Sequence, residues 1–299
     1  MQTAKPSQTA ALVAAARSLG QLLPKEQRLA YDPYGVAFLT GPVRSFSELM
    51  LSQPFLFSLL MARSRSLRSF IWWMQLRTRA IDAVLFEFIA SGGRQVLLLG
   101  AGYDCRAVRF AHLLGDANVF EVDHPVTQSH KRNIVSEAKL KSPARYLAWD
   151  FERDGLSGLG QRLAQEGLSR SHRLLTIWEG VTMYLSESTI TDTFDLVSKL
   201  GAKGSWLAFN YLHRRALELP DIEQKLTQRI ARGVGEPHRF GWEPEELSLW
   251  LHARNYVRIS DHSDRELARR HLSPLAAEHF SAENRHIAVA RSEGRDRPS

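Results

Sequence analysis

The sequence has very little cysteine, since Cys105 is the only one in 299 residues. No intramolecular disulfide is therefore possible, which is typical of proteins in a reducing compartment. No apolar run approaches the roughly 20 residues that a membrane-spanning helix needs. Residues 1–6 lack the apolar core of a signal peptide, and the mildly apolar residues 10–16 are followed by Arg17. We therefore expect a cytoplasmic protein without a membrane span.

Several catalytic motifs are also missing. The 11 histidines include no His-x-x-x-His pair, so no helical pair of metal ligands is predicted. There is no Gly-x-Ser-x-Gly, the turn that carries the nucleophile of α/β hydrolases. Cys105 lies in a glycine turn, where the volume of the side chain matters more than its reactivity. The sequence thus predicts neither a metal site nor a covalent nucleophile.

The chain is basic, with a formal net charge of +7 and an isoelectric point of about 9.7. The charge is dispersed, and we expect no nucleic-acid partner. The densest segment, residues 63–79, mixes arginines with apolar residues at helical spacing. Such a helix usually packs on the core with its arginines reaching outward. Two alternatives stay open: the helix could line an apolar substrate pocket, or it could contact a membrane surface or an acidic partner.

The most informative stretch is residues 95–106, Gln-Val-Leu-Leu-Leu-Gly-Ala-Gly-Tyr-Asp-Cys-Arg. It predicts a buried strand, and Gly100 and Gly102 predict a sharp turn where the backbone approaches a ligand closely. A second strand pattern ends at Asp123, where a carboxylate can accept hydrogen bonds from two ribose hydroxyls. The pattern predicts a nucleotide-binding crevice, with a plain strand–helix turn as the alternative.

The third glycine position separates two classes of ligand. A dinucleotide fingerprint has Gly or Ala three residues after the second Gly, beside the pyrophosphate, but this chain has Cys105. Asp104 also places a negative charge where a pyrophosphate would lie. S-adenosylmethionine has a ribose and no phosphate, so it suits this turn better. A nicotinamide-dependent dehydrogenase is the weaker alternative.

Strand and helix patterns alternate after residue 90 and predict a doubly wound, mainly parallel α/β sheet with helices on both faces. The predicted strands lie near residues 95–100, 118–123, 144–150, 173–179, 205–210, 256–260 and 285–291. The predicted helices lie near residues 105–114, 125–139, 157–166, 187–200 and 243–254. Ligands bind at the carboxyl ends of such strands, where Asp150 and Glu179 are expected beside Asp123. Asp150 alone could be a helix cap.

The rest of the chain divides around this sheet. Residues 1–90 predict an N-terminal helical cap, with turns at residues 32–33 and 41–42. Residues 91–291 predict the core, and residues 292–299 predict a disordered tail. An insertion at about 212–241, with two helical pieces around Pro220, is too long for an ordinary connection and predicts a substrate cap.

Several motifs taken together resemble one family. They are Leu99-Gly-Ala-Gly-x-Asp104-x-Arg106, Phe120-Glu-Val-Asp123-x-Pro125, Lys131, Trp178-Glu179-Gly180-Val-Thr-Met-Tyr184-Leu185, Ala14-Ala-Ala-Arg17, Asp32-Pro-Tyr34, Arg77-Thr-Arg79 with Asp82, and Gly235-Glu-Pro-His-Arg-Phe240. The set resembles the leucine carboxyl methyltransferase family, and more closely its bacterial branch of S-adenosylmethionine-dependent and polyketide-synthesis O-methyltransferases. The similarity covers roughly residues 8–290. Cys105 departs from the threonine that is usual there, but a small side chain packs in that place either way.

The resemblance implies a seven-stranded class I methyltransferase (Rossmann-like) sheet and S-adenosylmethionine as the cofactor. In the family pattern Asp123 would hold the ribose, and Asp150 with Phe151 would frame the adenine. Gly100 and Gly102 would line the cofactor at the turn, with Gly100 beside the methionine portion.

The methionine end of this cofactor needs an anion for its ammonium group and a cation for its carboxylate. Glu179 matches the family residue near the ammonium, and Arg77 matches the arginine that pairs with the carboxylate close to the substrate. A planar guanidinium suits that role because it binds a carboxylate through two hydrogen bonds. A surface helix charge is the alternative for Arg77. Arg17 corresponds less securely to a second basic contact.

The predicted reaction is methyl transfer to an oxygen of a small or carrier-bound acceptor, such as a polyketide-like metabolite. A carboxylate is favoured because it is the family's founding chemistry, and it is already ionised at neutral pH. For a hydroxyl acceptor the candidate bases are His124, Tyr184, Tyr211 and His213. The alternative from another class is a catalytically inactive methyltransferase-like module that binds the cofactor or a partner.

Overall fold

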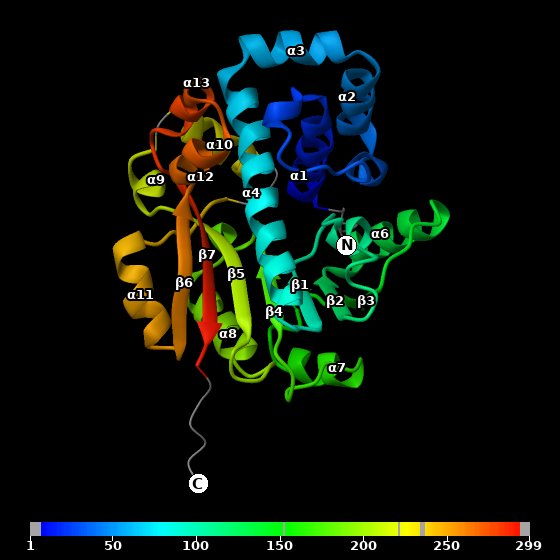
Figure 1. Ribbon diagram of the computed structural model, residues 1–299, viewed down its shortest axis with the longest axis vertical. Coiled ribbons are helices and arrows are strands. Elements are labelled where there is room, and N and C mark those ends of the chain that lie inside the picture. The colour runs from blue at the N-terminus through cyan, green and yellow to red at the C-terminus, as the bar shows by residue number, and fades with distance from the viewer. Residues whose placement is uncertain (1–6, 152, 221, 234–236, 294–299) are drawn as a thin grey trace.

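The computed structural model describes residues 7–151, 153–220, 222–233 and 237–293. Its strands are β1 (Gln95–Leu99), β2 (Asn118–Asp123), β3 (Ala144–Ala148), β4 (Leu175–Trp178), β5 (Trp206–Leu212), β6 (Tyr256–Ser263) and β7 (Arg285–Ser292). Within the described ranges they form one seven-stranded sheet in the order β3-β2-β1-β4-β5-β7-β6 (Figure 1). The first five pair in parallel, and β7 is antiparallel to both of its neighbours. The predicted doubly wound, mainly parallel sheet is confirmed.

The central strands are covered on both faces. Every residue of β1 and of β4 is buried, and neither strand carries a charged side chain. Near-continuous apolar runs of this kind are typical of parallel strands packed between two layers of helices. Leu98 of β1 pairs with Ile177 of β4 and with Glu121 of β2. This register brings the residues that follow the three strands to the same edge of the sheet.

Helix α4 (Arg65–Ala90) lies along one face of the sheet (Figure 1). Its residues Leu85 and Phe88 belong to the same apolar core as Leu98 and Ile177 of the sheet. Two helices between β6 and β7 add to this core, α12 (Asp264–His271) and α13 (Pro274–Ala277).

The opposite face is covered by α7 (Leu159–Gln165), α8 (Glu187–Val197) and α11 (Pro244–His252). Phe194 of α8 lies at the centre of this second core, with ring contacts to Trp178, Phe209 and Trp242. The helix predicted near residues 105–114 is much shorter: α5 spans Arg106–Arg109, and the chain continues in turns to the start of β2. Helix α6 (Pro125–Glu137) follows β2 as predicted.

The N-terminal region is helical, as the sequence predicts. It contains α1 (Gln8–Leu19), short 3-10 turns at Gly20–Leu22, Lys25–Gln27 and Gly35–Phe38, then α2 (Gly41–Ser52) and α3 (Pro54–Arg63). The expected turn at residues 41–42 is instead the start of α2. Proline fits there because the first helical turn has no partner for its N–H groups. Whether residues 1–90 form a separate cap stays a prediction.

The insertion after β5 contains the two predicted helical pieces, α9 (Arg215–Glu218) and α10 (Ile222–Gly233). Gly235 and Glu236 of the family motif at 235–240 lie outside the described residues.

Short 3-10 turns at Thr182–Tyr184 and Glu278–Phe280 complete the elements. At the carboxyl end, Ser292 closes β7 and Glu293 donates a backbone hydrogen bond to Asn255, whereas residues 294–299 of the predicted tail lie outside the described residues.

Candidate functional site

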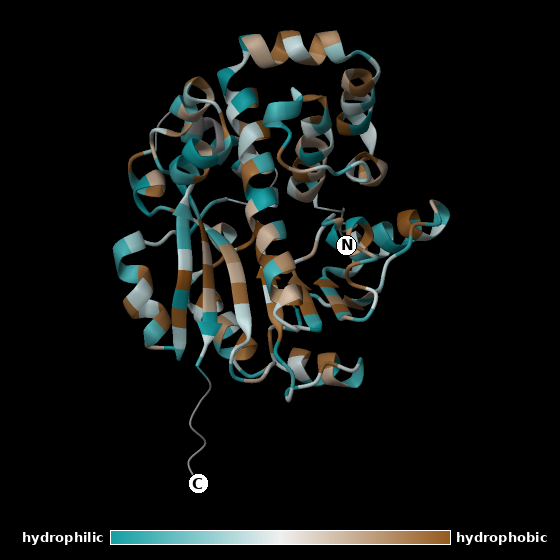
Figure 2. Ribbon diagram, viewed as in Figure 1, coloured by the Kyte–Doolittle hydropathy of each residue, from teal (hydrophilic) through white to brown (hydrophobic). Residues whose placement is uncertain are grey.

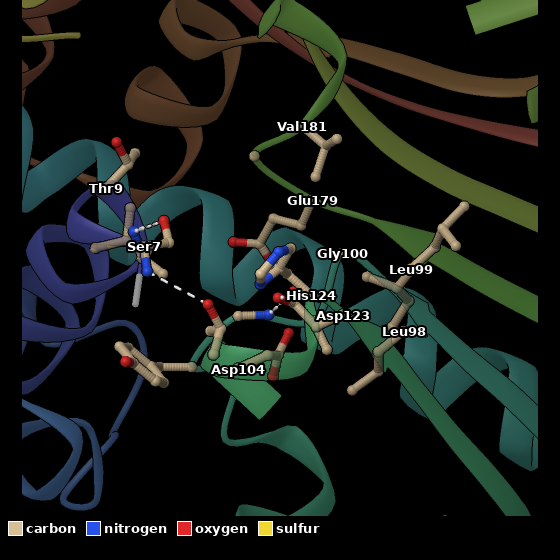
Figure 3. Close-up of a pocket in the computed structure, with 18 of the residues that line it drawn as sticks. Ser7, Thr9, Leu98, Leu99, Gly100, Asp104, Asp123, His124, Glu179 and Val181 are labelled. Atoms are coloured by element: carbon tan, nitrogen blue, oxygen red, sulfur yellow. Dashed lines mark hydrogen bonds between the residues drawn. The ribbon is translucent and has the colours of Figure 1, made fainter. Parts of the chain in front are cut away.

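A cavity of about 480 Å³ lies at the carboxyl ends of β1 and β4 (Figure 3). Small-molecule sites typically measure about 300–1,000 Å³. Its wall comes from the start of α1, from the turns after the strands and from α4. The lining residues are Ser7, Thr9, Ala10, Val13, Arg17, Arg77, Leu98, Leu99, Gly100, Ala101, Gly102, Tyr103, Asp104, Asp123, His124, Thr127, Ile177, Glu179, Gly180, Val181 and Tyr184. In Figure 3, Ser7 and Thr9 approach from the side opposite Glu179 and Val181.

The turn after β1 requires both of its glycines. Gly100 and Gly102 have φ angles of +69° and +46°, in the left-handed region that other residues rarely adopt. A Cβ on Gly100 would lie 2.8 Å from a methyl group of Val181, and one on Gly102 would lie 3.2 Å from Cβ of Ala10. Both glycines therefore keep backbone close to neighbouring segments at the cavity wall.

Asp123 closes β2 and orders the glycine turn. Its two carboxylate oxygens accept hydrogen bonds from the backbone N–H groups of Gly102, at 2.7 Å, and of His124, at 2.8 Å. Burial raises the pKa of this carboxyl group, and the two N–H donors and nearby Lys131 oppose the shift. An ionised carboxylate has about four lone-pair positions. Two are used here, so two remain for hydroxyl groups of a ligand.

Arg77 and Glu179 form an ion pair at the cavity wall. Arg77 Nε donates to Glu179 at 2.6 Å, and each side chain is only 6% exposed. Glu179 also accepts from Arg106 with its other oxygen. Burial alone would raise the pKa of Glu179, but Arg106 and then Arg77 lower it below the usual value. The structure thus places a buried anion and a buried cation side by side in the cavity.

The ion pair belongs to a larger buried network that the sequence analysis does not predict. Arg106 Nε donates to Asp82 of α4 at 2.8 Å, and its Nη1 contacts Asp104 as well as Glu179. Asp82 in turn accepts from Arg109 at 2.6 Å. The sequence contains Asp82, Asp104 and Arg106 within family motifs but gives no sign that these three residues meet.

Two further cations hold the carbonyl groups of the turn. Arg17 pairs with Asp32 at 3.0 Å and donates to the carbonyl oxygen of Tyr103. Lys131 donates to the next carbonyl, that of Asp104, at 2.5 Å, and pairs with Glu121 at the same distance. All four of these charged side chains are buried. The turn is therefore fixed by a cation from α1 and a cation from α6.

Asp150 and Phe151 do not reach the cavity wall. Strand β3 ends at Ala148, two residues before Asp150. The Asp150 carboxylate accepts the N–H of Arg153 at 3.1 Å and lies 3.7 Å from Nε2 of His124, which does line the cavity. The assignment of Asp150 and Phe151 to the adenine stays a prediction.

The four candidate bases separate into two groups. His124 and Tyr184 line the cavity. Tyr211 does not: it is fully buried and donates to Asp261 at 2.7 Å, and burial raises its pKa far above the usual value. His213 is also outside the lining and lies 3.6 Å from Glu243.

The described residues of the insertion after β5 contact the cavity wall at Tyr184 and the neighbouring Met183. The ring of His238 packs 5.4 Å from the ring of Tyr184, and the N–H of Arg239 donates to the carbonyl of Met183 at 2.7 Å. Burial lowers the pKa of His238 to about 4, so this ring is neutral at neutral pH. The role of this insertion as a substrate cap stays a prediction.

In the described part of the chain, no group of three or more His, Cys, Asp and Glu side chains is arranged to hold a metal ion. None of the helices in the described ranges combines the length and the apolar character that crossing a bilayer requires.

A seven-stranded sheet of this order, with a glycine turn after β1 and a carboxylate at the end of β2, defines the class I methyltransferase fold. The sequence profile of the leucine carboxyl methyltransferase family matches residues 10–198. The chain belongs to this family, and the predicted resemblance is confirmed.

Relatives agree with this assignment, and solved structures agree with the fold. A Streptomyces coelicolor protein named "putative S-adenosyl-L-methionine-dependent methyltransferase" is 30% identical over 230 residues, covering 75% of this chain and 74% of its own. A Mycobacterium tuberculosis protein of the same name is 27% identical over 241 residues, covering 80% and 71%. A methyltransferase-like structure from Thermobifida fusca has a TM-score of 0.60 at 17% identity, covering 98% and 97% of the two chains. A DUF574 family structure from Streptomyces avermitilis has a TM-score of 0.58 at 15% identity, covering 93% and 97%.

Proposed function

We propose that this protein is an S-adenosylmethionine-dependent O-methyltransferase whose acceptor is the carboxylate of a small or carrier-bound, polyketide-like metabolite. The family supports methyl transfer, and the names of the relatives support the cofactor. The observation that carries the proposal is the pairing of Arg77 with Glu179 in the cavity that Asp123 also lines.

The residues of the cavity fit this cofactor. Asp123 has lone pairs left for the two ribose hydroxyls. Each oxygen of Glu179 already accepts from one arginine, and a carboxylate oxygen can accept a second hydrogen bond from an ammonium group. Arg77 uses only Nε on Glu179, so its two terminal nitrogens are available to a carboxylate. Gly100 and Gly102, whose turn packs closely against Val181 and Ala10, also line the cavity.

The main task of these side chains is to position the cofactor and the acceptor. When bound, S-adenosylmethionine supplies an activated methyl group on sulfur. The protein then has to align the acceptor oxygen with that methyl group and exclude water. Leu98, Ile177 and Val181 supply apolar wall, where a carboxylate loses hydration and gains reactivity. A carboxylate needs no base, whereas a hydroxyl acceptor would use His124 or Tyr184, the two candidate bases that line the cavity.

Calorimetric titration with S-adenosylhomocysteine tests the cofactor. We expect micromolar binding to the wild type, none to Asp123→Ala, and no competition by NAD. Asp116→Ala, which removes an exposed carboxylate from the turns before β2, is the matched control and should bind normally. Binding of NAD in place of S-adenosylhomocysteine would contradict the proposal.

Methyl transfer to a panel of carboxylates and phenols tests the acceptor. A methyl ester releases methanol in alkali and a methyl ether does not, so the product identifies the oxygen. With a carboxylate acceptor the rate should stay nearly level between about pH 6 and 8. A steep rise through that range would favour a hydroxyl acceptor, and cofactor binding without turnover of any acceptor would favour an inactive binding module.

A further inference from the structure

Helix α3 is apolar on both of its sides. Phe57 and Met61 face the core and are buried, whereas Phe55, Leu56 and Leu59 are 75%, 37% and 38% exposed. Figure 2 shows α3 mainly in brown and pale tones although it lies at one end of the molecule, with little around its outer side. A helix that is apolar all round is normally covered all round.

The exposed apolar surface continues onto α2, where Phe46 and Leu49 are 42% and 48% exposed. Figure 1 shows α2 and α3 joined at the same end of the molecule. We call Phe46, Leu49, Phe55, Leu56 and Leu59 the apolar tip. Five of the twelve exposed large apolar side chains in the described residues fall in this segment, and the others are scattered. Concentrated apolar surface of this kind usually marks an interaction site.

The charged residues next to α3 in the sequence are basic. From the end of α3 into the first turn of α4 the chain carries Arg63, Arg65 and Arg68, and residues 49–76 include no acidic residue. Glu48 is neutralised by Arg44, which lies 2.8 Å away. Arg63 is exposed at the end of α3, four residues after Leu59 and therefore on the same side of the helix.

We propose that the apolar tip anchors the protein to the surface of an anionic lipid bilayer, with α3 lying in the plane of the interface. Phenylalanine and leucine side chains on one side of a helix, with arginines beside them, are typical of such helices. Each arginine near an anionic surface adds attraction that salt weakens. The outer side of α3 is a helix face at the end of the molecule, which suits a flat bilayer.

A second copy of the chain is the main competing occupant. In a symmetric dimer the same surface meets itself, so pairing through the apolar tip would bring the acid-free, arginine-containing segments of two copies together. Like charges at such short range oppose association. An anionic bilayer instead supplies both the apolar environment and the opposite charge. This inference does not depend on the identity of the acceptor or the cofactor.

Vesicle flotation tests the proposal. We expect the wild type to float with vesicles of phosphatidylcholine and phosphatidylglycerol, and much less with phosphatidylcholine alone. Phe55→Gln/Leu59→Gln should lower the partition coefficient more than about tenfold, because two apolar side chains no longer insert. The matched control is Leu249→Gln, since Leu249 is 76% exposed on α11 and should have no effect.

Arg63→Glu keeps the test informative if the double variant folds poorly. It should weaken binding to anionic vesicles by about tenfold, and added salt should weaken binding of the wild type. Failure of the wild type to bind anionic vesicles would overturn the proposal. So would equal binding of all variants, or a dimer in solution that Phe55→Gln/Leu59→Gln abolishes, which would assign the surface to self-association.

Discussion

Arg17 of helix α1 donates a hydrogen bond to the carbonyl oxygen of Tyr103, in the turn that follows β1. The two residues are 86 positions apart in the sequence, and both line the cavity. The same guanidinium pairs with Asp32, and burial of both groups makes the contact hard to replace. The position of α1 and the conformation of the glycine turn therefore depend on each other.

Arg17→Lys should weaken the binding of S-adenosylhomocysteine by about tenfold or more. A lysine keeps the charge, but its single ammonium group does not reproduce the fork that serves Asp32 and Tyr103 together. Calorimetry measures the effect. Arg28→Lys is the control, because Arg28 is exposed and donates only to the nearby carbonyl of Leu23. Equal affinities of the two variants would show that α1 does not hold the turn.

Glu179→Gln should lose stability and cofactor binding together. The change keeps the shape of the side chain but leaves Arg77 and Arg106 short of a buried anion, which typically costs about 3–5 kcal/mol. Glu48→Gln removes the carboxylate of an exposed pair with Arg44 and should cost less than about 1 kcal/mol. Urea unfolding compares them directly. Similar losses in the two variants would mean that the buried network contributes little.

Asp264 should make the protein less stable as the pH rises from about 4 to about 7. Burial raises the pKa of its carboxyl group from the usual 3.8 to about 7, and Arg285, 3.9 Å away, only partly opposes this. Between these values the folded state holds a proton that the unfolded state has released, so the free energy of unfolding falls with rising pH. Each unit of pKa difference corresponds to roughly 1.4 kcal/mol.

Asp264→Asn removes this titration and keeps the size of the side chain. The free energy of unfolding of Asp264→Asn should therefore change less between pH 4 and 7 than that of the wild type. Above about pH 7, the variant should have the larger free energy of unfolding. Unfolding in urea at several pH values measures both curves. Parallel curves for the two proteins would show that Asp264 is already ionised in the folded state.

Cys105 should be unreactive in the folded protein. It is 1% exposed, and burial raises the pKa of its thiol well above the usual value. A thiol-labelling reagent should therefore react only after unfolding, because the thiolate is the reactive form. Cys105→Thr should bind S-adenosylhomocysteine within a few-fold of the wild type. Fast labelling of the native protein would show that the turn opens readily.

The sheet can be predicted from the sequence because its central strands leave a strong local signal. The runs before Gly100 and Glu179 are almost wholly apolar, with Thr176 as the polar exception, and such runs are typical of parallel strands buried on both faces. Gly100 and Gly102 follow β1, and Asp123 closes the neighbouring parallel strand β2, so their meeting at one edge follows from the topology. Asp150 is different: the chain leaves the sheet at Ala148, and two extra residues turn its side chain toward Arg153.

The ion-pair network could not be predicted in the same way. Arg106 takes partners that lie 24 and 73 residues away, in α4 and after β4. A sequence with many arginines offers many such combinations, and only packing selects among them. Helices α12 and α13 were not expected either, because both are short and their positions depend on packing: α12 lies beside α4, and α13 packs on α12.

Strand β7 has a consequence for how the chain is made. It follows both β5 and β6 in the sequence, yet it lies between them in the sheet. During synthesis on the ribosome, those two strands emerge first and each keeps an open hydrogen-bonding edge until β7 arrives. Open edges pair readily with the wrong partner. A chain halted before residue 285 should therefore be prone to aggregation and a target for chaperones, even though every residue that lines the cavity has already been made.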